Sequence, residues 1–347
     1  MREDVIDIED SKLLHEYLVT TGRLGANEPF RARVLRGGVS NRTVLVEHPP
    51  RRAWVLKQAL PKLRVEVDWY SAPERIEREW LGLCLLRRLL GAQHIPAPVF
   101  LDRSNFLLAM HAVPAEAKNW KQQLLAGNLH ENRVVDFAKM LSTIHVQAWK
   151  NSDEWQPVLQ DKTFFESLRL EPYYEYTAGQ VPEAAQFLTC LVEETRDTSI
   201  TAVHGDYSPK NILVYRDRMV LLDHEVIHWG DPAFDVGFAV THLLSKAHHV
   251  VAKRRDFARS AGLFWEVYSH EVRKVAWWRG FNRRAARHLT ACLLARVAGR
   301  SQLEYLSAGE RQRQRQAVLS LIRKNVSTVS GVIRQFLQAI ACHKEPA

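Results

Sequence analysis

The sequence has few cysteines and no long apolar run. Its four cysteines lie far apart and include no CxxC pair: Cys84, Cys190, Cys292 and Cys342. Scattered thiols favour a reduced, cytoplasmic protein over a disulfide framework or a zinc site. No apolar run reaches the roughly 18 residues that span a bilayer. The acidic N-terminus, MREDVIDIEDSKLL, lacks the basic and apolar regions of a secretory signal. We therefore expect a cytoplasmic protein with no membrane partner.

Several catalytic signatures are missing as well. The sequence contains neither a GxxxxGK[ST] phosphate loop nor a GxGxxG fingerprint. It also contains neither an HExxH zinc motif nor a GxSxG nucleophile turn. These absences exclude a P-loop or dinucleotide cradle of the usual kind, and they give no support to zinc or serine hydrolysis.

The charge balance is basic. The chain has 347 residues and a net charge of +9, which suits either a nucleic-acid binder or an enzyme whose substrates are phosphates. The densest basic stretches are RRDFARS, RGFNRRAARH and RQRQRQ. Their arginines interleave with apolar positions, as on the solvated face of a helix. We therefore predict no nucleic-acid partner.

Strand patterns dominate the first third of the chain. After a helical stretch over 10–22, β-rich runs occur at 31–38, 42–48, 53–60 and 105–113. A helix is predicted over 71–91, with Ser71 as its cap and Gly91 at its end. From about residue 114 the spacing is helical, and strand signals remain only at 212–215 and 219–222. The sequence thus predicts an α+β fold with a small β-rich lobe (1–112) and a larger, mostly helical lobe (113–347).

The stretch HGDYSPKNIL, residues 204–213, carries the clearest chemical pattern. Asp206 is followed five residues later by Asn211, and Asp223 follows twelve residues after that, beyond a short hairpin. Phosphoryl transfer needs metal-bridged phosphates, an aligned hydroxyl group and a base beside it. Asp206 can be that base, and the oxygen atoms of Asn211 and Asp223 are the ligand type that Mg²⁺ prefers.

Together with LLDHEVIHWGDPAFDVG, residues 221–237, this stretch resembles the aminoglycoside phosphotransferase and choline kinase superfamily. The resemblance implies a bilobal, protein-kinase-like fold, with an N-terminal nucleotide-binding lobe and a C-terminal catalytic and substrate-binding lobe. It also implies ATP and Mg²⁺ as cofactors and a small-molecule hydroxyl group as the phosphate acceptor. His204 and Asp235 would brace the catalytic loop.

Positions in the N-terminal lobe extend the resemblance. Lys57 lies in VLKQ, where such kinases place a lysine that holds the α- and β-phosphates. A glutamate on the next helix should pair with it, and Glu77 and Glu79 compete for this role. Glu79 is preferred because an apolar stripe continues from it at helical spacing. The alternative is a surface helix with Glu–Arg pairs.

Further nucleotide contacts are predicted around the strand turn RGGVSN and the catalytic loop. The glycines of the turn allow the backbone to approach phosphates closely. The residues predicted to contact the nucleotide in these segments are Gly37, Gly38, Ser40, Asn41 and Lys210.

The stretch VLKQALPKLRVEVDWYSAPERIERE resembles the corresponding stretch of one branch of the superfamily, 5-methylthioribose kinase. Asp223 and Glu225 also match the Asp-x-Glu pattern of that branch. In that branch both acids serve the metal, and a paired arginine binds the sugar. In this sequence Ala295-Arg296 stands where that branch has the arginine pair, so only Arg296 matches. That branch also has no asparagine at the position of Asn211. Arg296 and Trp229 are the predicted substrate contacts. The acceptor is expected to be sugar-like, an amino alcohol or an aminoglycoside.

Other functions stay open at this point. A protein kinase is disfavoured because the sequence has DHE instead of DFG, and because Asp223 and Asp235 are only twelve residues apart, which leaves little room for a peptide-docking platform. A non-catalytic nucleotide-binding protein of the same fold and a methylthioribose kinase proper are the remaining alternatives. A homodimer is compatible with the sequence.

Overall fold

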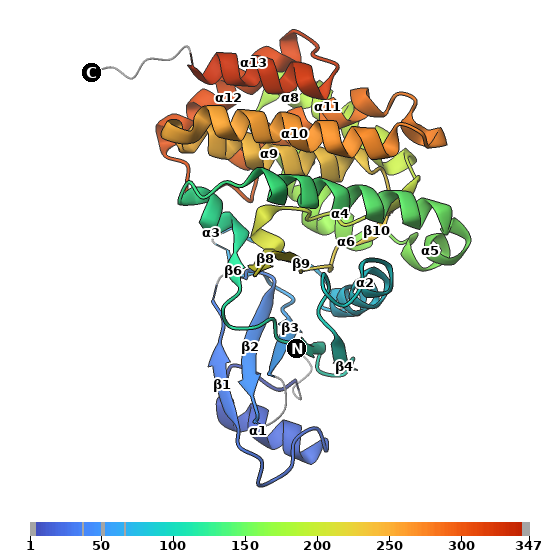
Figure 1. Ribbon diagram of the computed structural model, residues 1–347, viewed down its shortest axis with the longest axis vertical. Coiled ribbons are helices and arrows are strands. Elements are labelled where there is room, and N and C mark those ends of the chain that lie inside the picture. Colours follow the sequence, from blue (N-terminus) through green and yellow to red (C-terminus); the bar gives the residue numbers. More distant parts are fainter. Residues whose placement is uncertain (1–4, 37, 50–52, 66, 342–347) are drawn as a thin grey trace. The chain divides into compact units, whose positions relative to one another are not determined.

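The computed structural model describes residues 5–36, 38–49, 53–65 and 67–341. The chain divides into two compact units. Unit 1 consists of residues 1–117 together with 220–226, and unit 2 consists of 118–219 and 227–347 (Figure 1). The short returning segment is tied to unit 1 by a hydrogen bond from the Leu221 amide to the His94 carbonyl, at 2.8 Å.

Unit 1 is built on a five-stranded sheet with the order β1-β2-β3-β5-β4, whose neighbouring strands are all antiparallel. Its strands are β1 (Arg31–Val34), β2 (Asn41–Glu47), β3 (Trp54–Ala59), β4 (Pro98–Asp102) and β5 (Leu107–His111). Its helices are α1 (Ser11–Thr20) and α2 (Arg75–Leu90).

Side chains of the strands in unit 1 alternate between the apolar core and the opposite face of the sheet. Val44 and Leu56 are buried in one apolar cluster with Leu14 and Leu18 of α1. Successive side chains of a strand point to opposite faces, so Lys57 lies on the face away from that cluster. The helix α2 begins at Arg75, four residues after the predicted cap, and no side chain caps its first turn.

Unit 2 is mostly helical and has only short strands. Its strands are β6 (Lys118–Asn119), β7 (Thr201–Val203), β8 (Ile212–Tyr215) and β10 (His228–Gly230), while β9 (Arg218–Leu221) leads back into unit 1. Its α-helices are α3 (Trp120–Leu125), α4 (Glu131–Lys150), α5 (Ser152–Leu159), α6 (Thr163–Phe165), α7 (Tyr176–Gln180), α8 (Pro182–Asp197), α9 (Ala233–His249), α10 (Arg254–Val272), α11 (Phe281–Ala298), α12 (Ala308–Arg323) and α13 (Val329–Ala341). The other helical segments are the π-helix η1 (Glu166–Glu175) and the 3₁₀ turns η2 (Pro209–Asn211), η3 (Val251–Lys253) and η4 (Ala276–Trp278).

The helix α9 forms the centre of unit 2. Its residues 233–248 are all buried, and it packs against both α10 and α11 (Figure 1). At Gly237 a β-carbon would lie 2.6 Å from the Leu289 amide nitrogen of α11. Only glycine allows the two helices to approach so closely, which accounts for this residue in the sequence FDVG.

The π-helix η1 was not predicted from the sequence. It contains Pro172, which has no amide hydrogen to donate to the helical ladder. A widened helical turn next to such a residue is often associated with functional sites. Arg169 and Tyr173 lie on this segment.

The predicted fold class is confirmed, with a β-sheet N-terminal part and a mostly helical C-terminal part. The first unit runs to Ala117, whereas the sequence placed the lobe boundary after residue 112, and the return of 220–226 to this unit was not foreseen. Among the described residues, every helix is too short or too polar to cross a lipid bilayer.

Candidate active site

Lys57 on β3 holds two carboxylates of unit 1. Its Nζ lies 2.8 Å from Oε1 of Glu79 and 2.6 Å from Oδ1 of Asp223. The side chain is only 12% exposed. Burial alone would lower the pKa of Lys57, but the carboxylates of Asp223 and Glu79 raise it above its usual value. The lysine is therefore a fixed positive charge.

The partner of Lys57 on α2 is Glu79, one of the two glutamates that compete in the sequence. The Glu79 side chain is fully buried, and this burial raises its pKa, against the opposing effect of Lys57. Glu77 lies on another face of the same helix and accepts a hydrogen bond from the exposed Arg103 at 2.8 Å. The apolar stripe of α2 thus distinguished the two glutamates.

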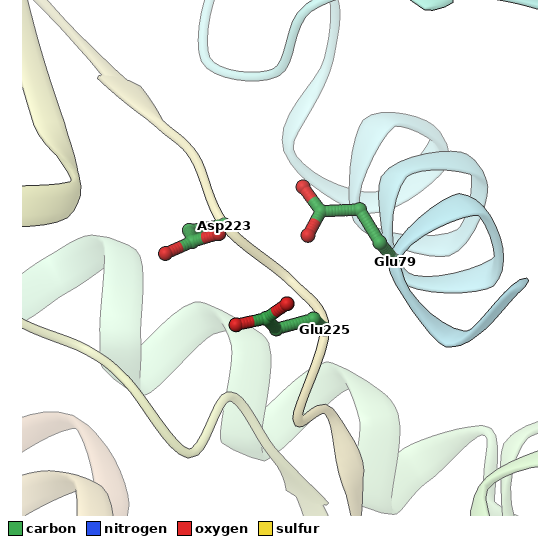
Figure 2. A group of neighbouring side chains, drawn as sticks. All are labelled: Glu79, Asp223 and Glu225. Atoms are coloured by element: carbon green, nitrogen blue, oxygen red, sulfur yellow. The ribbon is translucent and has the colours of Figure 1, made fainter. Parts of the chain in front are cut away.

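Three carboxylates gather beside Lys57. One oxygen from each of Glu79, Asp223 and Glu225 lies within 4.8 Å of the others. Figure 2 shows Glu79 extending from α2 towards the segment that carries the other two. Asp223 has a φ of 69°, in the left-handed region that few residues other than glycine adopt. This backbone conformation holds the carboxylate at the end of the hairpin.

Arg75, which no sequence motif marks, contacts this cluster through Glu225. Its Nε donates to Oε2 of Glu225 at 3.1 Å. The rest of its guanidinium group donates to the carbonyl oxygens of Ser40 and Leu60, and the side chain is fully buried. Arg75 precedes Glu79 by one helical turn, so the same helical stripe that indicated Glu79 also contained Arg75.

The predicted nucleotide turn meets the same cluster. Asn41 donates from Nδ2 to Oε2 of Glu225 at 3.2 Å and to Oγ of Ser40 at 3.1 Å. Its Oδ1 is buried without a hydrogen-bond partner among the described residues. A β-carbon at Gly38 would meet its nearest atom, the Asn41 carbonyl oxygen, at 3.8 Å, so packing does not require glycine there. Gly37 lies outside the described residues.

In unit 2, the catalytic loop fixes the carboxylate of Asp206. Asn211 donates from Nδ2 to Oδ2 of Asp206 at 2.7 Å and to its backbone carbonyl at 3.0 Å. Nη2 of Arg169 lies 3.0 Å from the same Oδ2. Both donors therefore use one oxygen of the carboxylate. Among the described residues, no hydrogen bond is made to Oδ1.

The loop itself is held from behind by Asp235. The carboxylate of Asp235 accepts from the backbone amides of His204, at 2.7 Å, and Gly205, at 2.8 Å. His145 also lies 3.2 Å from it. Burial would raise the pKa of Asp235, but the hydrogen bond from His145 and the nearby His204 lower it. Asp235 thus contacts the backbone of the loop. Gly205 has a φ of 77°, in the left-handed region that glycine adopts readily.

His204 and the remaining predicted residues have different surroundings. His204 is buried and its Nδ1 accepts from the amide of Asp206 at 3.2 Å, which holds the start of the loop. Lys210 is exposed, and its carbonyl accepts a hydrogen bond from Asn119. Trp229 is 3% exposed and lies in β10 opposite Ala202 of β7. Its contact with substrate stays a prediction.

Arg296 on α11 is 8% exposed. Its Nη1 donates to the hydroxyl groups of Tyr173, at 3.0 Å, and Ser301, at 2.8 Å. Tyr173 also lies beside Arg169, whose guanidinium carbon is 5.6 Å from the centre of the ring. Arg169, which the sequence analysis missed, therefore links Asp206 to the surroundings of Arg296. No motif marks it, because the link depends on the path of the π-helix.

The structure thus assembles two groups of residues. In unit 1, Lys57, Glu79, Asp223, Glu225 and Asn41 form one network of ion pairs and hydrogen bonds. In unit 2, Asp206, Asn211, His204 and Asp235 form the second network. The first offers a fixed cation and hard oxygen ligands, and the second offers a positioned carboxylate with one oxygen outside the network.

A family model described as "Phosphotransferase enzyme family" matches residues 31–265, which is more than half of the chain. This match confirms the superfamily indicated by the catalytic loop and the predicted enzyme class. It contains no indication of the methylthioribose kinase branch, which stays a prediction. No curated protein sequence matches the chain.

Solved structures with the same fold are distant in sequence. The choline kinase from Cryptosporidium parvum Iowa II is 11% identical, with a TM-score of 0.56, and the match covers 94% of this chain and 100% of that one. The choline/ethanolamine kinase family protein from Mesorhizobium loti is 13% identical, with a TM-score of 0.50, and the match covers 96% of this chain and 99% of that one. At these identities the similarity establishes the fold.

Proposed function

The chain belongs to the Phosphotransferase enzyme family, and we propose that it transfers the γ-phosphate of ATP to a hydroxyl group of a small molecule. Unit 1 supplies the groups for the nucleotide, and unit 2 supplies the base. The observation that carries the proposal is the asymmetric binding of the Asp206 carboxylate, in which both donors use Oδ2.

Asp206 acts as the general base in this proposal. Asn211 and Arg169 fix the orientation of its carboxylate. Oδ1 then accepts a hydrogen bond from the acceptor hydroxyl group and takes its proton as the oxygen attacks the γ-phosphorus. The bond from the γ-phosphorus to the β,γ-bridging oxygen breaks, and ADP leaves. Such a positioned base typically contributes about 10²–10⁴-fold to a rate.

Lys57 binds the phosphate oxygens in this scheme, and Glu79 orients it. The ammonium group is held by carboxylates on two sides, so its position is fixed before ATP binds. Preorganised charge of this kind needs no rearrangement during the reaction. Gly38 and Ser40 of the turn before β2, and Asn41 at the start of β2, would contact the phosphates.

The acidic cluster fits Mg²⁺. The oxygens of Asp223 and Glu225 are hard ligands, and both hydrogen bonds that Glu225 accepts use Oε2. Lys57 pairs with one oxygen of Glu79 and one of Asp223. The predicted ligands Asp223 and Glu225 would hold the ion, and Asn211 of unit 2 stays a prediction as a further ligand. When bound, Mg²⁺ neutralises charge on the phosphate oxygens.

The acceptor is proposed to be a small alcohol. The two structural neighbours named above are a choline kinase and a choline/ethanolamine kinase family protein, and both names describe small alcohols as acceptors. Methylthioribose stays among the acceptors to be tested, because Arg296 matches one arginine of the pair in that branch.

A coupled ATP-consumption assay over sugars, thiosugars, amino alcohols and aminoglycosides tests the proposal. We expect ATP turnover that depends on one class of acceptor and on Mg²⁺, together with a phosphorylated product detected by mass spectrometry. ATP binding without transfer to any hydroxyl compound would contradict it and would favour a nucleotide-binding protein of the same fold.

A further inference from the structure

A stripe of basic residues runs along one face of α9. His242, Lys246 and His249 follow one another at spacings of four and three residues, which places them on the same side of the helix. Lys246 is fully buried. Its Nζ donates to the His242 carbonyl at 3.2 Å and lies 5.3 Å from the centre of the Tyr305 ring.

Other cations surround this stripe. Lys121 of α3 lies 5.9 Å from the centre of the same Tyr305 ring, and it forms an ion pair with Glu304. The Arg296 carbonyl accepts from the Leu303 amide at 3.0 Å, which ties the segment before Tyr305 to α11. Burial, together with Lys246 and Arg296, keeps the pKa of His242 well below its usual value, so this imidazole is neutral.

Lys246 and Arg296 have little negative charge beside them, whereas His249 of the same stripe pairs with Glu310 at 3.1 Å. Among the described residues, no carboxylate lies within ion-pair distance of Lys246 or Arg296. Glu304 is the acid that affects Lys246, and it is already paired with Lys121. A buried ammonium group without a carboxylate partner is costly. The C-terminal turn of α9, whose carbonyl groups carry partial negative charge, offsets part of this cost.

Several polar atoms at the stripe also have no hydrogen-bond partner among the described residues. They are Nε2 of His242, Nε of Arg296 and the hydroxyl group of Tyr305, each with almost no exposed surface. A buried polar atom without a partner loses the hydrogen bonds that it makes to water in the unfolded chain, which destabilises the folded protein. Buried polar groups are nearly always paired in native proteins, so three such atoms beside an unpaired ammonium group indicate a ligand.

This basic cluster is connected to the catalytic loop within unit 2. Arg296 donates to the hydroxyl group of Tyr173 at 3.0 Å. Arg169, one helical turn before Tyr173, lies 3.0 Å from Asp206. Lys210 of the catalytic loop also influences the pKa of His242. A ligand at the cluster would therefore lie next to the residues that position the base.

We propose that Lys246, Arg296, Tyr305 and His242 form a binding site for an anionic group, a carboxylate or a phosphate, on the acceptor. The inference rests on the proposed function, since the hydroxyl group of the same molecule would be the one that Asp206 activates. It makes the acceptor a hydroxy acid or a phosphorylated alcohol, in contrast to the cationic choline named for the structural neighbour.

The cluster supplies what such a group needs. Lys246 and Arg296 provide positive charge, and the Arg296 Nε and the Tyr305 hydroxyl group provide directed donors. Because these groups are already buried, a bound anion would make strong, charge-assisted hydrogen bonds. A cationic acceptor would meet unpaired positive charge instead, which disfavours it.

Matched acceptors that differ only in charge test the inference. We would compare glycerol with glycerate and glycerol 3-phosphate, and glucose with gluconate and glucose 6-phosphate, in both ATP-coupled turnover and calorimetric binding. We expect one anionic member of a series to be preferred over its neutral counterpart by at least about tenfold in kcat/KM or Kd. The carboxylate and phosphate arms distinguish the two sources of negative charge.

Variants of the cluster locate the effect. In Lys246→Met and Arg296→Gln we expect the preference for the anion to fall to within about threefold, whereas the exposed Lys139→Met of α4 retains it. Two cluster variants are used because, if one of them fails to fold, the other still tests the site.

The outcomes separate the two proposals. Phosphorylation of neutral alcohols with no preference for anions in either measurement would overturn the anion site and leave the proposed function intact. Binding of anions that depends on Lys246, without any phosphorylated product, would support the site and contradict the proposed function. Anion binding that is unchanged in both cluster variants would overturn the assignment to these residues.

Discussion

Arg169 forms an ion pair with Asp206, with Nη2 lying 3.0 Å from Oδ2, and its Nε donates to the Gly205 carbonyl at 2.7 Å. One guanidinium group thus fixes both the backbone and the carboxylate of the catalytic loop. The planar geometry of the group makes this two-point contact possible, and a lysine at the same place would make only one.

Replacing Arg169 should slow the chemical step. For Arg169→Lys we expect kcat to fall about 10–100-fold, because the Asp206 carboxylate loses its fixed orientation. KM for ATP should change by less than about threefold, since the residues proposed to bind the phosphates, Lys57, Ser40 and Asn41, belong to unit 1. Steady-state kinetics with varied ATP would measure both. The exposed Arg323→Lys of α12 is the control. A rise in KM for ATP with unchanged kcat would contradict this role.

The two glutamates of α2 give a matched pair of variants. Glu79→Gln removes the charge that orients Lys57, so we expect kcat/KM for ATP to drop by at least about tenfold. Glu77→Gln affects only the surface pair with Arg103 and should leave kcat/KM within about twofold. Initial rates over a range of ATP concentrations measure both. Equal effects of the two substitutions on kcat/KM would contradict the assignment of Glu79, and not Glu77, as the functional partner of Lys57.

Lys246 should make the stability of the protein depend on pH. Burial, and then the charges of Lys121 and Arg296, lower its pKa from 10.5 to about 7, against the opposing effect of Glu304. The unfolded chain therefore takes up a proton between these values that the folded chain does not. Stability from this group is present above the ordinary pKa and is lost as pH falls towards 7.

Lys246→Met removes this penalty. Among the surrounding groups, the neutral His242 and the Tyr305 ring tolerate an apolar side chain. We expect Tm to rise relative to the unsubstituted protein, and to rise more at about pH 6.5 than at about pH 9.5. Thermal denaturation at the two pH values measures the difference. An equal shift at both would indicate that Lys246 has an ordinary pKa in the folded protein.

Local patterns predicted the parts of the fold and of the site that depend on spacing along the chain. The β-rich run 53–60 predicted the strand that carries Lys57, and the stripe on α2 separated Glu79 from Glu77. The catalytic loop with Asp206 and Asn211 was visible because both residues lie on one short segment.

Contacts between distant segments could not be read in this way. Arg169 reaches Asp206 only through the path of a π-helix interrupted by Pro172. The basic cluster joins α9, α11 and the segment around Tyr305, which no sequence spacing relates. Trp229 lies almost fully buried in β10, and its contact with substrate stays a prediction.

The most direct test of Asp206 as the general base is the rate of phosphate transfer by Asp206→Asn. This rate is measured in single turnover with the acceptor found in the screen. The exposed Asp217→Asn, on the hairpin that follows, is the matched control. We expect transfer to slow by about 10²–10⁴-fold in Asp206→Asn, with binding of ATP retained, and to be unchanged in Asp217→Asn. Transfer by Asp206→Asn at a rate within about threefold of the unsubstituted protein would contradict the assignment of Asp206 as the base.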